Sequence, residues 1–143
     1  MTRISAWVNY IRSKRPSERN NGRVYTLKFT EDGLNDVKAL PKGDKNALKA
    51  ELLKNLSTNP KQCGEPLLPP LGGWYSFHYL EYRVIYRVYD DLLAVGIAGV
   101  GKHDKNAEND IYRRLEDAAK SGRLAESVLV ALRDFTGPHQ GPI

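Results

Sequence analysis

Two histidines stand close to arginines and lysines in the middle of the chain. His78 lies in the run GGWYSFHYLEYRVIYR, and His103 lies in VGKHDK. An imidazole can take up or release a proton near neutral pH, and a guanidinium group matches the geometry of a phosphate. These groups suit metal-free cleavage of RNA, which needs a general base for the 2′-hydroxyl, a general acid for the 5′-oxygen and cations at the phosphorane.

Strand alternation indicates which of these side chains share a face. Two strands are expected over 75–80 and 83–89, joined by a tight turn. Across such a turn His78 falls on the same face as Arg83 and Arg87, and one register places His78 directly opposite Arg83. The aromatic and valine side chains form the other face. The cationic face is then either part of a site or an ordinary solvated outer surface.

The next two elements add further candidates. A third strand over 92–100 is apolar on both faces and rich in glycine and alanine, so we expect it inside the sheet. A helix is expected to open at Asp110. For Lys102 or Lys105 considered by itself, the competing interpretation is an ordinary exposed lysine with no role in a site. The candidates that follow the strand or open the helix are Lys102, His103, Lys105, Tyr112 and Arg113.

Other kinds of site fit the sequence less well. The two histidines have no third metal ligand at a suitable spacing. The run GVGK lacks the glycine spacing and the terminal Ser or Thr of a phosphate-binding P-loop. The single cysteine, Cys63, excludes an internal disulfide and a cysteine-rich zinc site. The sequence therefore predicts no metal and no cofactor.

The surrounding elements predict an α+β fold. After a strand over 24–29, Thr30 is a good N-cap for one helix, and Asp44 is expected to cap a second helix beyond the break at Pro41. The hydrophobic period then changes from 3.6 to 2 for the three strands. The expected architecture is an N-terminal αα-hairpin packed on a small, twisted, mainly antiparallel sheet.

The two ends of the chain differ from this central part. A last helix carries apolar residues that either pack on the core or mediate a dimer, and these are Leu124, Val128, Leu129 and Leu132. The net charge of +5 matches that of residues 1–23, which hold six basic residues and one acidic residue, whereas the other 120 residues are balanced at 16 and 16. This arm suits a nucleic acid or an acidic protein, or it is a solubilising tail. With no apolar run near the roughly 20 residues of a membrane span and no signal-peptide pattern, we expect a cytoplasmic protein.

Three segments then occur in a distinctive order: YTLKFTEDGLNDVKAL, LSTNP, and PLLPPLGGWYSFHYLEYRVIYRVYDDLLAVGIAGVGKHDKNAENDIYRRL. In this order and spacing they resemble the RelE/ParE superfamily of toxins from type II toxin–antitoxin modules, in particular the RelE/HigB-like mRNA interferases. The resemblance implies a RelE-like toxin domain over 24–116. The basic arm with a short helix over 1–23 and the additional helix and flexible tail over 117–143 lie outside the family pattern. The resemblance also implies a cognate antitoxin in a hetero-oligomer, the ribosomal A site and mRNA as partners, with no membrane involved.

The resemblance also assigns roles to residues. The strand arginine of the family falls on Arg83, its basic pair on Ser76 and His78, the basic residue after the Gly-Lys turn on His103, and the tyrosine that opens the last helix on Tyr112. Two usual cations are therefore histidines here, which implies either a His/His mechanism, with either histidine as the base, or reduced activity. The alternative activity is that of a ParE-like toxin, which inhibits DNA gyrase without cutting nucleic acid. The expected catalytic residues are His78, Arg83, His103 and Tyr112, and the expected RNA-binding residues are Ser76, Arg87, Lys102, Lys105 and Arg113.

Overall fold

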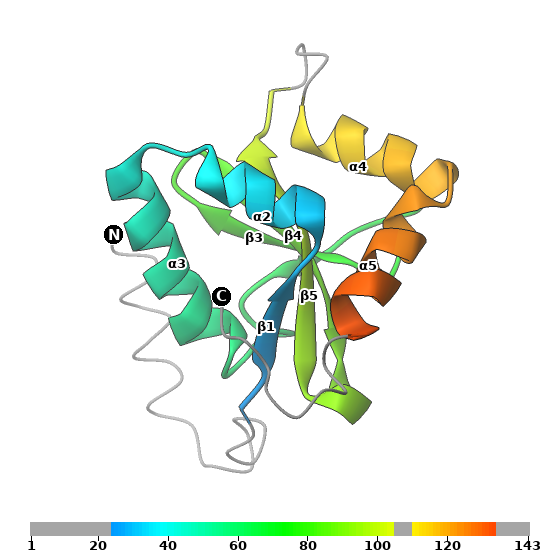
Figure 1. The fold of residues 1–143 in the computed structure, drawn as a ribbon, viewed down its shortest axis with the longest axis horizontal. Coiled ribbons are helices and arrows are strands. Elements are labelled where there is room, and N and C mark those ends of the chain that lie inside the picture. The colour runs from blue at the N-terminus through cyan, green and yellow to red at the C-terminus, as the bar shows by residue number, and fades with distance from the viewer. Residues whose placement is uncertain (1–23, 105–109, 134–143) are drawn as a thin grey trace.

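The computed structural model describes residues 24–104 and 110–133, and Figure 1 shows their fold. In the described part, the strands form one five-stranded sheet in the order β1-β5-β4-β3-β2. β1 runs parallel to β5, and the other neighbouring pairs are antiparallel. The predicted α+β class with a mainly antiparallel sheet is therefore confirmed. The elements are β1 (Thr26–Phe29), α2 (Glu31–Lys38), α3 (Lys42–Leu56), β2 (Glu65–Pro66), β3 (Tyr75–Tyr79), β4 (Tyr82–Tyr89), the 3-10 helix η3 (Asp90–Leu92), β5 (Ala94–Lys102), α4 (Ile111–Lys120) and α5 (Arg123–Arg133).

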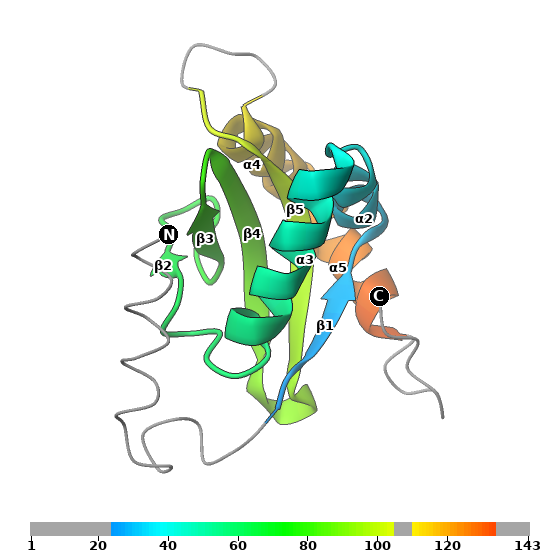
Figure 2. The ribbon, with the colours of Figure 1, turned by 90° about the vertical axis from the view of Figure 1, so that its left-hand side faces the viewer.

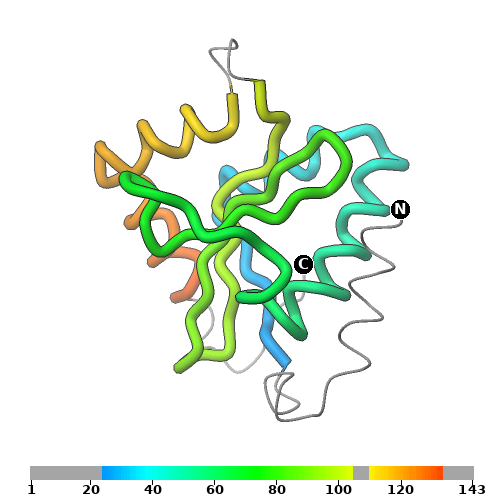
Figure 3. Tube along the Cα trace, turned by 180° about the vertical axis from the view of Figure 1, so that it is seen from behind, coloured from blue at the N-terminus to red at the C-terminus, as the bar shows by residue number. Residues whose placement is uncertain are grey.

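Helices cover both faces of the sheet (Figure 2). One core joins α2 and α3 to the sheet through Val37 and Leu48, and a second core joins α4 and α5 to the opposite face through Ile111 and Leu124. Seen from behind, the segment before β3 runs across towards α4 and α5 (Figure 3). Trp74, at the end of this segment, is part of the second core. The alternation of polar and apolar residues in β3 and β4 is typical of a sheet with one face exposed to solvent. Much of that face is instead buried under the last two helices.

The first helix pair is held by capping contacts. The Thr30 hydroxyl accepts a hydrogen bond from the Gly33 N–H (3.0 Å) and donates one to the Ala98 carbonyl (3.2 Å), so the predicted cap also fastens α2 to β5. The prediction of Asp44 as the cap of α3 is wrong, because the helix already starts at Lys42. Asp44 lies in the first turn, where a carboxylate interacts favourably with the helix dipole, and it accepts the Tyr82 hydroxyl at 2.8 Å. This hydrogen bond raises the pKa of Tyr82 to about 12.

The last helix packs on the core of the domain. Leu124 and Val128 are buried against the sheet, whereas Leu129 is 65% exposed. At about 100° per residue, Leu129 lies on the other side of α5 from Leu124. No helix of the described ranges is long and apolar enough to cross a membrane. The basic arm over 1–23, Lys105 and the tail after 133 lie outside the described residues.

Candidate functional site

The predicted cationic face is formed by two rows of paired residues that cross the sheet. The register with His78 opposite Arg83 is confirmed. Because residues paired across neighbouring strands project to the same side, Ser76, His78 and Arg83 share the face that carries α4. The two rows are Ser76–Ile85–Gly99 and His78–Arg83–Gly101.

Glycines in β5 let α4 lie directly on these rows. A Cβ atom at Gly99 would lie 3.2 Å from side-chain atoms of Ile111 and Leu115, and one at Gly101 would lie 3.3 Å from Ile111 Cβ. Both approaches are tighter than ordinary van der Waals contact, so a larger residue would displace the helix. The first turn of α4 is thereby held over the end of β3 that contains Ser76.

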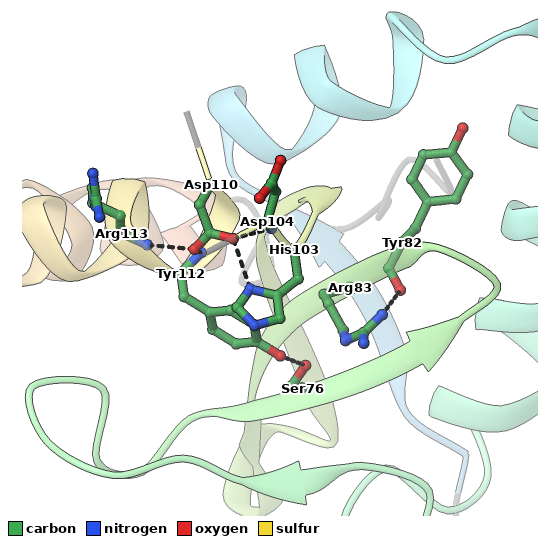
Figure 4. Close-up of polar contacts among 8 residues, drawn as sticks. All are labelled: Ser76, Tyr82, Arg83, His103, Asp104, Asp110, Tyr112 and Arg113. Atoms are coloured by element: carbon green, nitrogen blue, oxygen red, sulfur yellow. Dashed lines mark hydrogen bonds and ion pairs between the residues drawn. The ribbon is translucent and has the colours of Figure 1, made fainter. Parts of the chain in front are cut away.

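This close approach brings together four polar side chains from three parts of the chain (Figure 4). The Tyr112 hydroxyl lies 2.7 Å from Ser76 Oγ, and His103 Nδ1 lies 2.7 Å from Asp110 Oδ1. The imidazole of His103 and the ring of Tyr112 meet edge to face, with their centroids 4.7 Å apart. Ser76, Tyr112 and His103 were all predicted to act in one site, and the structure places them in a continuous series of contacts that ends at Asp110.

Asp110 is the member of this group that the sequence did not assign to the site. It was expected only to open a helix, and it does cap α4. Its buried carboxylate also accepts hydrogen bonds from His103 and from the Asp104 N–H. Burial acts to raise the pKa of Asp110, but these bonds, together with that from the Arg113 N–H, outweigh burial and hold the pKa below its usual value. The available signal was an N-cap carboxylate seven residues after a histidine at a strand end.

Arg83 lies beside this group. Its guanidinium donates to the Tyr82 carbonyl at 3.3 Å, and within 24–104 and 110–133 it makes no ion pair. It pairs with Gly101, two residues before His103. His78, on its other side, has Nε2 at 2.9 Å from the Leu80 carbonyl. Because a carbonyl oxygen only accepts, this nitrogen carries a hydrogen.

The remaining predicted residues do not join this group. Lys102 is exposed and pairs with Glu81 at 3.0 Å. The side chain of Arg113 is exposed and points away from Tyr112 (Figure 4). Arg87 lies four residues beyond Arg83 on β4, with its guanidinium 5.7 Å from the centre of the Tyr89 ring. There it lines a groove of about 330 Å³ with apolar side chains that include Trp74, Leu124, Val128 and Leu129.

Two further features bear on the chemistry of the site. Among the described residues, no three or more His, Cys, Asp or Glu side chains are grouped as potential metal ligands. Cys63 lies outside the site, 4.0 Å from the Tyr86 hydroxyl. Burial raises the pKa of its thiol to about 12, which keeps the sulfur in its unreactive protonated form.

Comparison with known proteins identifies the family. Residues 27–107, which are 81 of the 143 residues, match the family described as the ParE toxin of the type II toxin–antitoxin system parDE. The chain belongs to this family, and it is a type II toxin of the RelE/ParE superfamily. The resemblance seen in the sequence motifs is therefore confirmed. Helices α4 and α5 both lie beyond the matched segment.

A curated toxin and a solved structure from Mycobacterium tuberculosis each match this chain over most of their own length. The toxin RelG of Mycobacterium tuberculosis is 36% identical over 90 residues, which cover 63% of this chain and 98% of RelG. The crystal structure of the toxin–antitoxin complex RelBE2 from the same organism contains a chain that is 30% identical, with a TM-score of 0.55. That match covers 57% of this chain and 94% of the other.

Proposed function

We propose that this toxin is a ribosome-dependent endoribonuclease that cleaves mRNA and thereby inhibits translation. The observation that carries the proposal is the contact between His103 Nδ1 and the buried Asp110 carboxylate, beside the row that holds Arg83. A histidine oriented by a carboxylate is a suitable proton-transfer group, and an arginine that makes no ion pair with the residues that the structure describes is a suitable ligand for a phosphate. The similarity to the toxin RelG supports the same class of protein.

The chemistry requires no redox change and no external nucleophile. A general base removes the proton of the 2′-hydroxyl, and the new O2′–P bond forms as the P–O5′ bond breaks. A general acid gives a proton to O5′, so the products are a 2′,3′-cyclic phosphate and a 5′-hydroxyl. His78 and His103 share the two proton transfers in this proposal. The base receives one proton and the acid supplies one, so protons balance over the reaction.

Arg83 and Tyr112 bind the substrate in this proposal. Arg83 stabilises the charge of the phosphorane, because it pairs with His78 on one side and, on the other, with Gly101, two residues before His103. Tyr112, held at its hydroxyl by Ser76, orients the nucleotide by stacking. Lys102 and Lys105 would add charge near the RNA backbone rather than take part in the reaction.

We also propose the partners of this toxin. The similar RelBE2 chain was solved as a toxin–antitoxin complex, so we infer that a cognate antitoxin binds and neutralises this protein in a hetero-oligomer. The ribosome and the translated mRNA are the proposed targets. These assignments predict growth arrest when the chain is produced without its antitoxin and recovery when both are produced.

Primer extension on a translated message tests the proposed activity. Induction of the wild-type chain should create new 5′ ends in the coding region that disappear when translation initiation is blocked. His103→Ala and Arg83→Ala should remove these ends, whereas Lys120→Ala, which removes an exposed cation of α4, should retain them. Cleavage that persists in both site variants would refute the assignment of these residues.

The second candidate function is inhibition of DNA gyrase. It is favoured by the description of the matching family as a ParE toxin. Inhibition of this kind requires no proton-transfer pair, so a carboxylate-bound histidine would have no role in it. A supercoiling assay with purified gyrase separates the two functions, because inhibition of supercoiling without new mRNA ends would favour the gyrase inhibitor.

A further inference from the structure

One buried carboxylate connects the end of β5 to the start of α4. Asp110 is 5% exposed. Its Oδ2 accepts the N–H groups of Tyr112 (3.0 Å) and Arg113 (3.2 Å), and its Oδ1 accepts His103 Nδ1 (2.7 Å) and the Asp104 N–H (2.6 Å). Each oxygen therefore binds a different part of the chain: Oδ2 accepts from the first turn of α4, and Oδ1 accepts from the two residues that follow β5.

Helix capping alone does not explain this division. An N-cap needs a single acceptor directed at the first free N–H groups of the helix, and serine or asparagine provides it as well as aspartate does. Only an ionised carboxylate has two acceptor oxygens, so only it can cap α4 and accept the imidazole N–H at the same time. The second oxygen is thus available for a role at His103.

We propose that Asp110 is a positioning residue that holds the hydrogen of neutral His103 on Nδ1 and thereby makes Nε2 the nitrogen that exchanges a proton with RNA. This inference rests on the endoribonuclease function proposed above. A carboxylate at Nδ1 keeps the imidazole in one tautomer and one orientation, and it stabilises the imidazolium that forms when Nε2 takes up a proton. Because the same carboxylate caps α4, it also sets the place of Tyr112 relative to His103.

Asparagine at position 110 separates the two roles of this side chain. In Asp110→Asn the amide oxygen can still accept from Tyr112 and Arg113, so the cap of α4 is retained. The amide nitrogen then faces His103 and can only donate, which favours the tautomer with the hydrogen on Nε2. The amide nitrogen also leaves the Asp104 N–H without its acceptor, whereas the cap of α4 is kept, and Nε2 of the neutral ring can no longer accept a proton.

The first measurement is independent of activity. Long-range ¹H–¹⁵N correlation spectra of the imidazole ring should show the Nδ1–H tautomer of His103 in the wild-type chain and the Nε2–H tautomer in Asp110→Asn, with a melting temperature lowered by no more than a few degrees. Asp110→Ser is a second variant, because serine also caps a helix but is too short to span both groups. Retention of the Nδ1–H tautomer in both variants would overturn the proposal.

The second measurement is the rate of cleavage of translated mRNA. Asp110→Asn should lower it by a factor on the order of 10³ to 10⁴, the effect of a wrong tautomer in a carboxylate–histidine pair. Asp117→Asn is the matched control, since it removes an exposed carboxylate from the same helix and should leave the rate within about twofold.

A double variant distinguishes positioning from a structural effect. If Asp110 acts through the imidazole, Asp110→Asn should lower the residual rate of His103→Ala by less than about twofold. An equal loss in both backgrounds would show that Asp110 acts on the fold and would overturn the proposal. If the wild-type chain cuts no translated mRNA, the proposed function fails, and the tautomer measured in the spectra still decides whether Asp110 controls His103.

Discussion

The two ends of the sheet face under α4 and α5 carry the same type of side chain in different surroundings. β4 places Arg83 at one end and Arg87 at the other, on the same face and about 13 Å apart for four residues of extended strand. Arg83 lies next to polar groups contributed by the end of β5 and the start of α4. Arg87 instead lines the apolar groove beside Trp74 and α5.

The difference between these ends arises from residues distant in the sequence. β5 carries one extra residue where Ile85 pairs with Gly99 and Tyr86 with Ile97, and this irregularity separates the two ends. Such a bulge increases the local twist and changes the direction of the side chains that follow. The polar site lies beside the Arg83 end of β4, and the apolar groove lies beside the Arg87 end.

The largest expected contrast is between the two arginines of β4. Arg83→Ala should lower cleavage of translated mRNA by roughly 10²- to 10³-fold, as expected for the loss of a group that stabilises the charged transition state. Arg87→Ala should lower it by less than about tenfold, because Arg87 lies at the apolar end. Primer extension over a time course after induction measures both rates. Equal losses would mean that both ends of the face bind the reacting RNA.

Local pattern was sufficient to predict that His78 and Arg83 share a face, but it left the register of the hairpin open. Alternation and a short turn, both of which depend on residues close in sequence, allowed the pairing of His78 with Arg83 as one register, and the structure has that register. The Thr30 cap was predicted for the same reason. Asp44 was assigned wrongly because a helix can start at more than one position in a run such as PKGD, and the contact with Tyr82 depends on packing 38 residues away.

The contacts that complete the site could not be predicted from the sequence pattern. The bond between His103 and Asp110 depends on how closely α4 approaches the sheet, and this is set by Gly99 and Gly101 against Ile111. A glycine-rich strand indicates close packing but not which helix packs there. Alternation also could not show that Arg87 would face α5, because α5 follows it by more than 30 residues.

The next prediction concerns the stability of the apolar end. Leu124→Ala should lower the free energy of unfolding by about 2 to 4 kcal/mol, since it removes a side chain that is 5% exposed in the second core. Leu129→Ala, on the exposed side of the same helix, should change it by less than about 0.5 kcal/mol. Urea denaturation measures both values. A small effect at Leu124 would mean that α5 contributes little to the core.

The glycines of β5 offer a smaller test of the same contrast. Gly99→Ala should lower the free energy of unfolding by about 1 to 2 kcal/mol, because the new Cβ lies 3.2 Å from Ile111 and Leu115. Gly96→Ala, at the apolar end, should be nearly neutral, since its Cβ meets Tyr89 at 3.4 Å and Val128 at 3.7 Å. Gly99→Ala should also slow cleavage by moving Tyr112. Cleavage at the wild-type rate in Gly99→Ala would show that α4 can shift without harm to the site.

The smallest expected effect is a change of stability with pH that depends on Asp110, at the polar end of the face. The pKa of Asp110 lies below its usual value in the folded chain, so its ionised form stabilises the fold above the unfolded pKa of about 4, and this contribution is lost as pH falls through the lower, folded pKa. The difference in unfolding free energy between wild type and Asp110→Asn, about 1 kcal/mol at neutral pH, should therefore shrink as the pH falls below about 4. The difference produced by Leu124→Ala should stay constant over the same range, because no ionisable group is removed. Denaturation curves recorded from pH 7 to pH 3 measure the difference in unfolding free energy for each of the two variants. A constant difference for Asp110→Asn would show that the carboxylate does not stabilise the folded chain through its charge.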